Sequence, residues 1–282
     1  MDYYTGILKR ALAITSRYRQ LWLFAFTSAF LVMVVSMISP WIRPTAGAPP
    51  TTVIPWGLFC GLSTIVAVVG ILFAFLAQGA LIGMVREIEA TGATTVRSGW
   101  QAGRSRLLSL IGIGIILGIP MVLVMFTLSA TFRAGGPMGV TYTWPWTLFV
   151  LVAGALLGLI QALAYRVCVI KVKVAYDALV TGLSLLRRNL RLVVPVWLAL
   201  MVIGWVEGLL GMVVSALCGL SPLPSYSPLP AVGFPSLSIP PLATGPIPTA
   251  IALVFSVLVG GFVMVFTSTA WTVLYLRLPA KE

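Results

Sequence analysis

Six long apolar stretches, separated by shorter polar or proline-rich segments, set the pattern of the chain. They cover residues 21–39, 57–85, 107–131, 146–169, 192–219 and 249–276. Each stretch is long enough to cross about 30 Å of hydrocarbon as a helix. The pattern therefore predicts an all-α, polytopic membrane protein with six transmembrane helices.

Segments of mixed polarity precede the first, third and fifth stretches. In residues 3–20, apolar side chains recur at helical spacing at Ile7, Leu8, Ala11, Ile14 and Tyr18. Most of the basic side chains of this segment lie on other faces of the helix. This spacing is typical of a basic amphipathic helix that lies at a membrane interface. Residues 90–106 and 177–189 are expected to form a second and a third interfacial segment.

This order divides a single membrane domain into three units, at about residues 1–89, 90–175 and 176–282. Each unit is expected to have one cytoplasmic amphipathic helix followed by a hairpin of two spanning helices. A Pro-Trp-x-Leu-Phe motif supports the repeat, because it occurs at residues 55–59 and again at 145–149. Each copy is expected to open a returning helix, with proline in the first turn and tryptophan at the interface.

Three further expectations concern local structure. Lys171–Val174 is expected to extend the fourth spanning helix, with its lysines reaching back to the interface, because an isolated strand beside lipid would leave backbone groups unpaired. Pro120 is expected to kink the third spanning helix. Residues 220–248, rich in proline and without charge, are expected to form an extended external loop.

The basic residues indicate how the chain is oriented. All lysines and arginines except Arg43 and Arg133 fall on the side shared by the two termini. The positive-inside rule then places both termini in the cytoplasm. The chain has a net charge of +12 but is 60% hydrophobic and only 9% charged. We therefore interpret the positive charge as orientation in an anionic membrane, and we expect no nucleic-acid partner.

The inventory of reactive side chains is small. Six acidic residues and no histidine leave few groups for acid–base chemistry or metal binding, so we expect a protein that is not an enzyme and holds no cofactor or metal. The three cysteines lack CxxC spacing. Cys60 and Cys218 are expected near outer helix ends, where they either pair or, like Cys168, fill apolar space.

Glu207 is the first candidate for a functional side chain inside the membrane. It lies about the middle of the fifth apolar stretch, where a charge costs on the order of 3 kcal/mol. It is either a proton or cation site or a structural acid that joins two helices. Gln78 and Gln161 are further intramembrane polar candidates, for which interhelical hydrogen bonds are the main expectation.

Three arginine clusters fall just before the spanning hairpins. They comprise Arg17 and Arg19; Arg104 and Arg106; and Arg187, Arg188 and Arg191. Anchoring of the topology explains them without any further role. The alternative hypothesis is that the clusters bind anionic lipid headgroups around the cytoplasmic face.

Local motifs at both ends of the chain resemble a known group of proteins. They are Leu-Lys-Arg-Ala-Leu at residues 8–12, Tyr-Arg-Gln-Leu-Trp-Leu-Phe at 18–24 and Ala-Trp-Thr-Val-Leu-Tyr at 270–275. The sequence is similar to uncharacterised bacterial six-helix membrane proteins grouped with the membrane domain of glycerophosphodiester phosphodiesterases. This resemblance implies the fold and a bacterial inner membrane, and it brings no catalytic residues.

Two functions from different classes fit these observations. The first is a non-enzymatic integral membrane protein that packs with a membrane-protein partner or organises membrane lipids. The second is a transporter or channel for a small solute or ion that uses Glu207, since internal repeats are common in transporters.

Overall fold

The computed structural model describes residues 2–38, 56–135, 140–217 and 246–278. These residues form seven helices. In chain order the helices are α1 (Asp2–Arg17), α2 (Gln20–Ile38), α3 (Trp56–Thr91), α4 (Val96–Gly135), α5 (Val140–Ile170), α6 (Ala175–Leu217) and α7 (Pro246–Arg277). The predicted all-α class is therefore confirmed.

Five of these helices contain stretches long and apolar enough to cross a membrane. The stretches are Thr64–Thr91, Val96–Leu123, Val152–Ile170, Ala175–Val214 and Val254–Arg277. The described side chains of α2 cover the shorter apolar stretch Gln20–Phe30. Spans of this length and composition are typical of a membrane protein.

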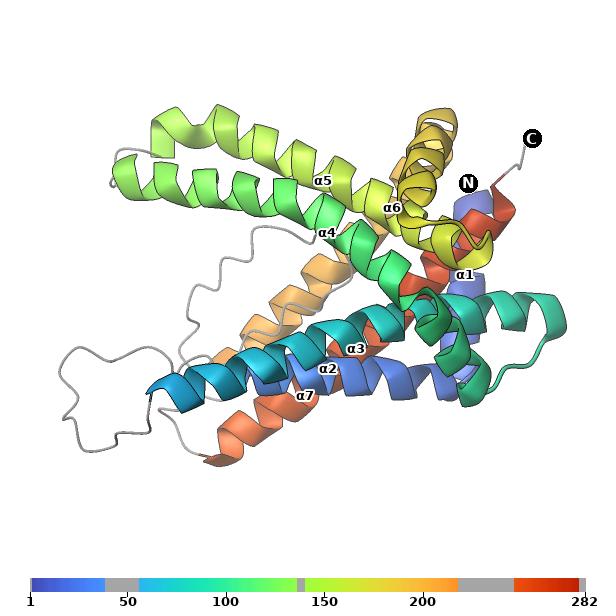
Figure 1. Cartoon of the computed structure of the whole chain (residues 1–282), viewed down its shortest axis with the longest axis horizontal. Helices are drawn as coiled ribbons and strands as arrows, with labels where there is room; N and C mark the ends of the chain where they lie inside the picture. Colours follow the sequence, from blue (N-terminus) through green and yellow to red (C-terminus); the bar gives the residue numbers. More distant parts are fainter. Residues whose placement is uncertain (1, 39–55, 136–139, 218–245, 279–282) are drawn as a thin grey trace.

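The long helices form two groups that diverge from one end of the molecule (Figure 1). Helices α2, α3 and α7 pack side by side, and α4 and α5 form a second pair. Helix α1 and both chain ends lie at the end where the two groups meet. Within an 18-residue apolar window of each helix, 67% of the residues are buried in α7, compared with 11% in α4. Helix α7 is therefore central, and α4 exposes most of its apolar surface.

Helix α1 packs mainly against α7. Its buried side chains Ile7, Ala11 and Ile14 recur at helical spacing and belong to the main core. This is the apolar face that the sequence pattern predicts.

Small residues allow α3 and α4 to approach closely. A Cβ added to Gly103 of α4 would lie 2.5 Å from the carbonyl oxygen of Leu76 and 3.1 Å from the backbone nitrogen of Ala80. Gly79 of α3 faces the same contact, since a Cβ there would lie 2.9 Å from the Cα of Gly103. Only hydrogen side chains fit this crossing, which holds the two helix groups together.

The two later interfacial segments have different outcomes. The segment expected at residues 90–106 is not a separate helix, because α4 is continuous from Val96 through Pro120. The segment expected at residues 177–189 does end at a break, because two helices meet within α6 at a kink at Asn189, whose dihedral angles are not helical (φ −118°, ψ 26°). Its position at a membrane interface stays a prediction.

The expected helical extension over Lys171–Val174 is wrong. Helix α5 ends at Ile170, and Val172 adopts a positive φ of 60° before α6 begins. The chain must reverse here because α6 packs against α5. The side chain of Lys173 donates a hydrogen bond to Thr181 Oγ1 at 3.0 Å, so it is held by α6.

The two Pro-Trp motifs occupy different positions. Trp56 is the first residue of α3, as expected for an entry motif. Helix α5, in contrast, begins at Val140, so Pro145 lies beyond its first turn and does not open the helix. The loop expected at residues 220–248 lies mostly outside the described residues, as do Arg43 and Cys218, and the pairing of Cys60 with Cys218 falls there too. Cys168 is a buried free thiol in α5.

Candidate functional site at the basic end of the bundle

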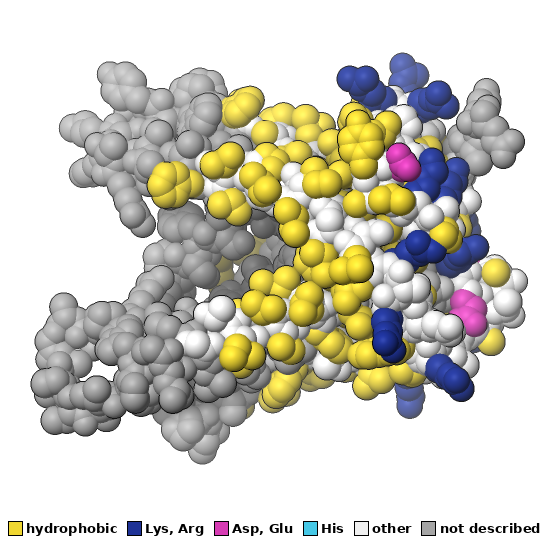
Figure 2. All heavy atoms as spheres, viewed as in Figure 1, with side chains coloured by type: hydrophobic (Ala, Val, Ile, Leu, Met, Phe, Trp, Pro, Cys, Tyr) yellow, Lys and Arg dark blue, Asp and Glu magenta, His cyan; other side chains and the backbone are white. Residues whose placement is uncertain are grey.

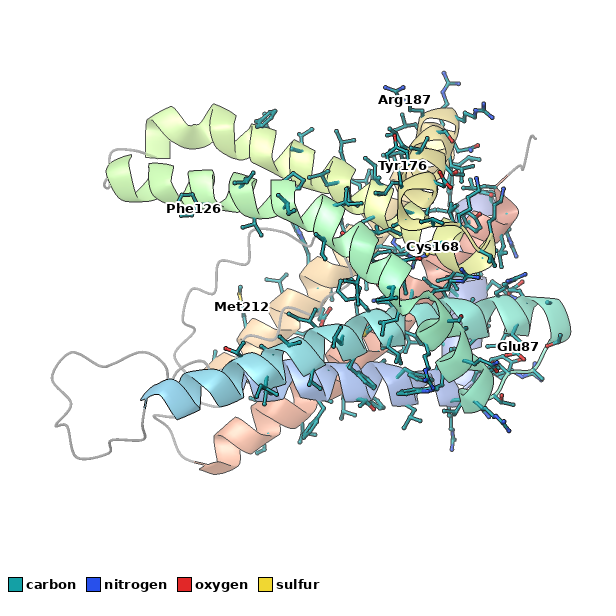
Figure 3. The ribbon with its side chains drawn as sticks, viewed as in Figure 1. Glu87, Phe126, Cys168, Tyr176, Arg187 and Met212 are labelled. Atoms are coloured by element: carbon teal, nitrogen blue, oxygen red, sulfur yellow. The ribbon has the colours of Figure 1, made fainter. Side chains whose placement is uncertain are left out.

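Lysine and arginine side chains gather at one end of the molecule (Figure 2). This basic end includes the three arginine clusters on α1–α2, α4 and α6. Their members Arg17, Arg19, Arg104, Arg187, Arg188 and Arg191 are exposed, and Arg106 is partly exposed. In Figure 3, Glu87 and Arg187 lie toward this end, whereas Phe126 and Met212 lie away from it. The structure therefore brings the three clusters to a common end of the bundle.

Two adjacent tyrosines fasten α1 across this end. The hydroxyl of Tyr4 donates to the carbonyl oxygen of Arg191 in α6 at 3.0 Å. The hydroxyl of Tyr3 lies 3.5 Å from the carbonyl oxygen of Arg277 in α7. Helix α1 thus bridges the last two long helices, and it holds the first arginine cluster in a fixed position relative to the third.

A second pair of contacts joins α1 to the end of α3. Arg10 Nε donates to Glu89 Oε1 at 2.9 Å. The hydroxyl of Tyr18 donates to the carbonyl oxygen of Gly92 at 2.7 Å. The hydrogen bond and charge of Glu89 raise the pKa of the Arg10 guanidinium above its ordinary value.

A pocket of about 240 Å³ lies between these two contacts. We name it the α1–α3 pocket. It is lined by both arginines of α1, a tyrosine and a mostly apolar floor: Arg10, Ala13, Ile14, Arg17, Tyr18, Ile88 and Gly92. The guanidinium of Arg17 lies 5.8 Å from the centre of the Tyr18 ring, within the range of a cation–π contact. Sequence reasoning identified Arg17 but missed the pocket, since its walls come from segments about 75 residues apart.

The acidic residues neutralise little of the basic end. Glu89 pairs with Arg10, the only ion pair among the described residues. Glu87 instead accepts hydrogen bonds from the hydroxyls of Thr94 and Ser98, at 2.7 and 2.5 Å. Arginines without carboxylate partners leave a net positive field, which attracts anionic groups.

The turn between α3 and α4 is built by those same hydroxyl residues. Gly92 has a positive φ of 75°, and Thr95 caps α4 by accepting the backbone N–H of Ser98 at its Oγ1 (3.1 Å). Ser98 Oγ accepts the backbone N–H of Thr95 at 3.3 Å in return. This reciprocal capping arrangement fixes the start of α4 and thereby the approach of its arginines.

Glu207 lies away from the three arginine clusters in sequence, on the later half of α6. It is partly exposed, and it has no hydrogen-bond or ion-pair partner among the described residues. A Cβ added to Gly204, Gly208 or Gly211 would meet nothing within 4 Å. Among the described residues, no neighbouring helix packs closely on this glycine face, and no hydrogen bond or ion pair joins Glu207 to a second helix.

Of the two glutamines, Gln161 forms a hydrogen bond other than the expected one, and the expectation for Gln78 stays a prediction. The side-chain amide of Gln161 donates to the hydroxyl of Tyr165, one turn along the same helix, so the expected interhelical bond is not the one that forms. Gln78 is partly buried in α3. No described hydrogen bond brings either glutamine to Glu207.

Arg166 is the buried cation that sequence reasoning placed on the cytoplasmic face. It lies in the core of α5 with 4% of its surface exposed. Its Nη1 donates to the carbonyl oxygen of Ala162 at 2.7 Å, its Nη2 reaches that of Ser268 at 3.4 Å, and its Nε has no partner among the described residues. The position of Arg166 inside the apolar run 162–170 was the signal in the sequence that its side chain is buried.

Comparisons with protein-family models, with curated proteins and with solved structures found no match for this chain. The resemblance drawn from the local motifs therefore stays a prediction.

Proposed function

We propose that this protein is a non-enzymatic integral membrane protein that organises anionic lipid at its basic end. It spans a bacterial inner membrane with six helices in three hairpin units, α2–α3, α4–α5 and α6–α7, and both termini are cytoplasmic. The observation that carries the proposal is the gathering of unpaired arginines at one end of an apolar bundle.

The packing of the short helices supports the arrangement into units. The beginning of α4 packs on α3 at Gly103, the beginning of α6 packs on α5 at Gly182, and α1 packs on α7. Each amphipathic segment would thus lie on the returning helix of the preceding hairpin, with the first unit closing on the last. Such a closed ring of three units would place the three arginine clusters around one cytoplasmic face.

Retention of lipid by the purified protein tests this function. Native mass spectrometry would count phosphatidylglycerol and phosphatidylcholine molecules bound to the wild type and to a variant in which every cluster arginine is replaced by glutamine. The substitutions are Arg17→Gln, Arg19→Gln, Arg104→Gln, Arg106→Gln, Arg187→Gln, Arg188→Gln and Arg191→Gln. We expect the variant to lose most of its preference for the anionic lipid. Equal retention by both proteins would overturn the proposal.

The open face of α6 supports a membrane-protein partner as the second part of this function. Large apolar side chains there are exposed, including Trp205 at 65% and Leu209 at 60%. Beside them lie the glycines with open space in front of them. Small residues in such positions allow close approach of another spanning helix.

Glu207 favours a second candidate function, transport of a proton or a cation. A carboxyl group without a partner in an apolar helix is costly and is usually retained for a role. Ion flux into proteoliposomes would be measured for the wild type and for Glu207→Gln. Flux that the substitution abolishes would establish transport and overturn the purely organising function, whereas absence of flux from both proteins would exclude this candidate.

A further inference from the structure

The α1–α3 pocket has the chemistry of an amphiphile site. Its rim carries the guanidinium groups of Arg17 and Arg10 and the ring of Tyr18, whose hydroxyl donates to Gly92, while Ile14 and Ile88 form an apolar floor. A purely electrostatic surface would have no such floor. A ligand that matches both parts has an anionic group next to hydrocarbon.

We propose that this pocket binds the phosphodiester and glycerol portion of one anionic phospholipid. The inference rests on the proposed function, because it requires the basic end to face a lipid leaflet. It goes further because it assigns the lipid to one defined pocket rather than to the exposed arginines in general.

Arg17 supplies the charge for this site. Its guanidinium has no carboxylate partner among the described residues and lies against the Tyr18 ring, which limits the directions it can take. A guanidinium presents a planar fork of donors that matches two phosphate oxygens. Preorganisation of this kind improves binding because less side-chain freedom is lost with the ligand.

Arg10 lines the pocket two turns before Arg17 on the same helix. One of its donors, Nε, is occupied by Glu89, and the terminal nitrogens make no hydrogen bond to another described residue. Its charge is balanced by Glu89, so it adds hydrogen-bond donors rather than net charge. The pocket therefore carries the charge of one unpaired arginine, which suits a phosphodiester with a single negative charge.

The volume of the pocket limits the ligand to a headgroup. Pockets that enclose drug-sized ligands have volumes of about 300–1,000 Å³, and this one has about 240 Å³. It can hold a phosphodiester with its glycerol carbons, and the acyl chains would continue into the bilayer beside α1. A lipid that lies in this pocket would also bridge α1 and α3.

The sequence offers a matched pair of variants for the test. Arg17 lines the pocket and Arg19 does not, although the two are exposed, two residues apart and equal in charge. Ala13→Leu fills the pocket without changing the charge. Because Ala13 and both arginines are exposed, these substitutions leave the core in place.

The experiment titrates the full-length protein in detergent with phosphatidylglycerol, phosphatidylcholine and water-soluble glycerol phosphate, and counts bound molecules by native mass spectrometry. We expect Arg17→Gln to weaken phosphatidylglycerol binding at the tightest site about tenfold, as charge-assisted hydrogen bonds do. Ala13→Leu should weaken it similarly, and Arg19→Gln by about twofold or less. Glycerol phosphate should bind at least about tenfold more weakly, because it lacks the acyl chains that would continue beside α1 outside the pocket.

The outcomes distinguish a failure of this inference from a failure of the proposed function. Equal losses in Arg17→Gln and Arg19→Gln, or no loss in Ala13→Leu, would overturn the pocket while leaving lipid organisation by the basic end intact. Glycerol phosphate bound as tightly as the lipid would overturn the assignment to a lipid. A wild type that does not prefer phosphatidylglycerol to phosphatidylcholine would overturn both the pocket and the proposed function.

Discussion

The basic end and the outer segments of this protein are built differently. At the basic end, hydrogen bonds and an ion pair tie α1 to α3, α6 and α7. The outer segments, residues 115–126 of α4, 148–156 of α5 and 202–217 of α6, instead expose most of their large apolar side chains. The difference indicates that helix positions are specified at the basic end, while the outer segments present hydrocarbon to their surroundings.

A pair of glycines in α4 provides the largest expected contrast. Gly103→Val should destabilise the protein by about 3 kcal/mol, because even a Cβ would overlap the Leu76 backbone. Gly118→Val should change stability by less than about 1 kcal/mol, since nothing lies within 4 Å of its Cβ position. Thermal unfolding in detergent would measure both. Similar losses in the two variants would show that the outer part of α4 is packed as tightly as the crossing.

Substitution of the buried Arg166 by an apolar residue should stabilise the protein. Arg166→Met keeps most of the volume and removes a desolvated charge with an unpartnered Nε, so the same unfolding measurement should show a gain of about 1–4 kcal/mol. Arg104→Met, at an exposed position of the basic end, should stay within about 0.5 kcal/mol of the wild type. A loss on Arg166→Met would mean that the hydrogen bonds of the guanidinium to Ala162 and Ser268 outweigh the cost of its desolvation.

The cap of α4 should contribute a smaller amount. Thr95→Ala removes the oxygen that accepts the Ser98 N–H and should cost about 1 kcal/mol. Val174 occupies the matching place before α6, where its carbonyl accepts the N–H of Ala178 but its side chain offers no cap. Val174→Thr should therefore raise the unfolding temperature slightly. A fall on that substitution would contradict the equivalence of the two turns.

The ion pair of α1 with α3 should have the smallest effect. The side chain of Arg10 is 49% exposed and that of Glu89 is 23% exposed, so solvent screens their attraction. A double-mutant cycle with Arg10→Gln and Glu89→Gln should give a coupling of about 0.5 kcal/mol that declines with added salt. A coupling above about 2 kcal/mol would show that the pair is shielded from water.

Periodicity predicted the helices well because it depends on local spacing. The burial of Ile7, Ala11 and Ile14 followed from their positions along one helix face. The turn at Val172 was not predictable in this way, since a β-branched residue at positive φ gives no local signal. Pro145 was misleading because its place before an apolar run resembled a helix start.

The site was predictable only in part. Charge patterning identified Arg17, but the pairing of Arg10 with Glu89 and of Tyr18 with Gly92 joins residues far apart in the chain. The burial of Arg166 was not predicted, because the run of apolar residues around it ends near the basic end, where an exposed arginine is equally compatible with the pattern. Whether such a side chain is buried depends on contacts between helices, and a hydropathy pattern does not reveal those contacts.

Labelling of single cysteines tests the central claim, that the basic end faces the cytoplasm, most directly. In a background with Cys60→Ser, Cys168→Ala and Cys218→Ser, the variants Ser16→Cys and Ser236→Cys would be exposed to an impermeant maleimide in intact and in permeabilised cells. We expect labelling at Ser236→Cys in intact cells, and at Ser16→Cys only after permeabilisation. Labelling of Ser16→Cys in intact cells, with Ser236→Cys protected, would contradict it.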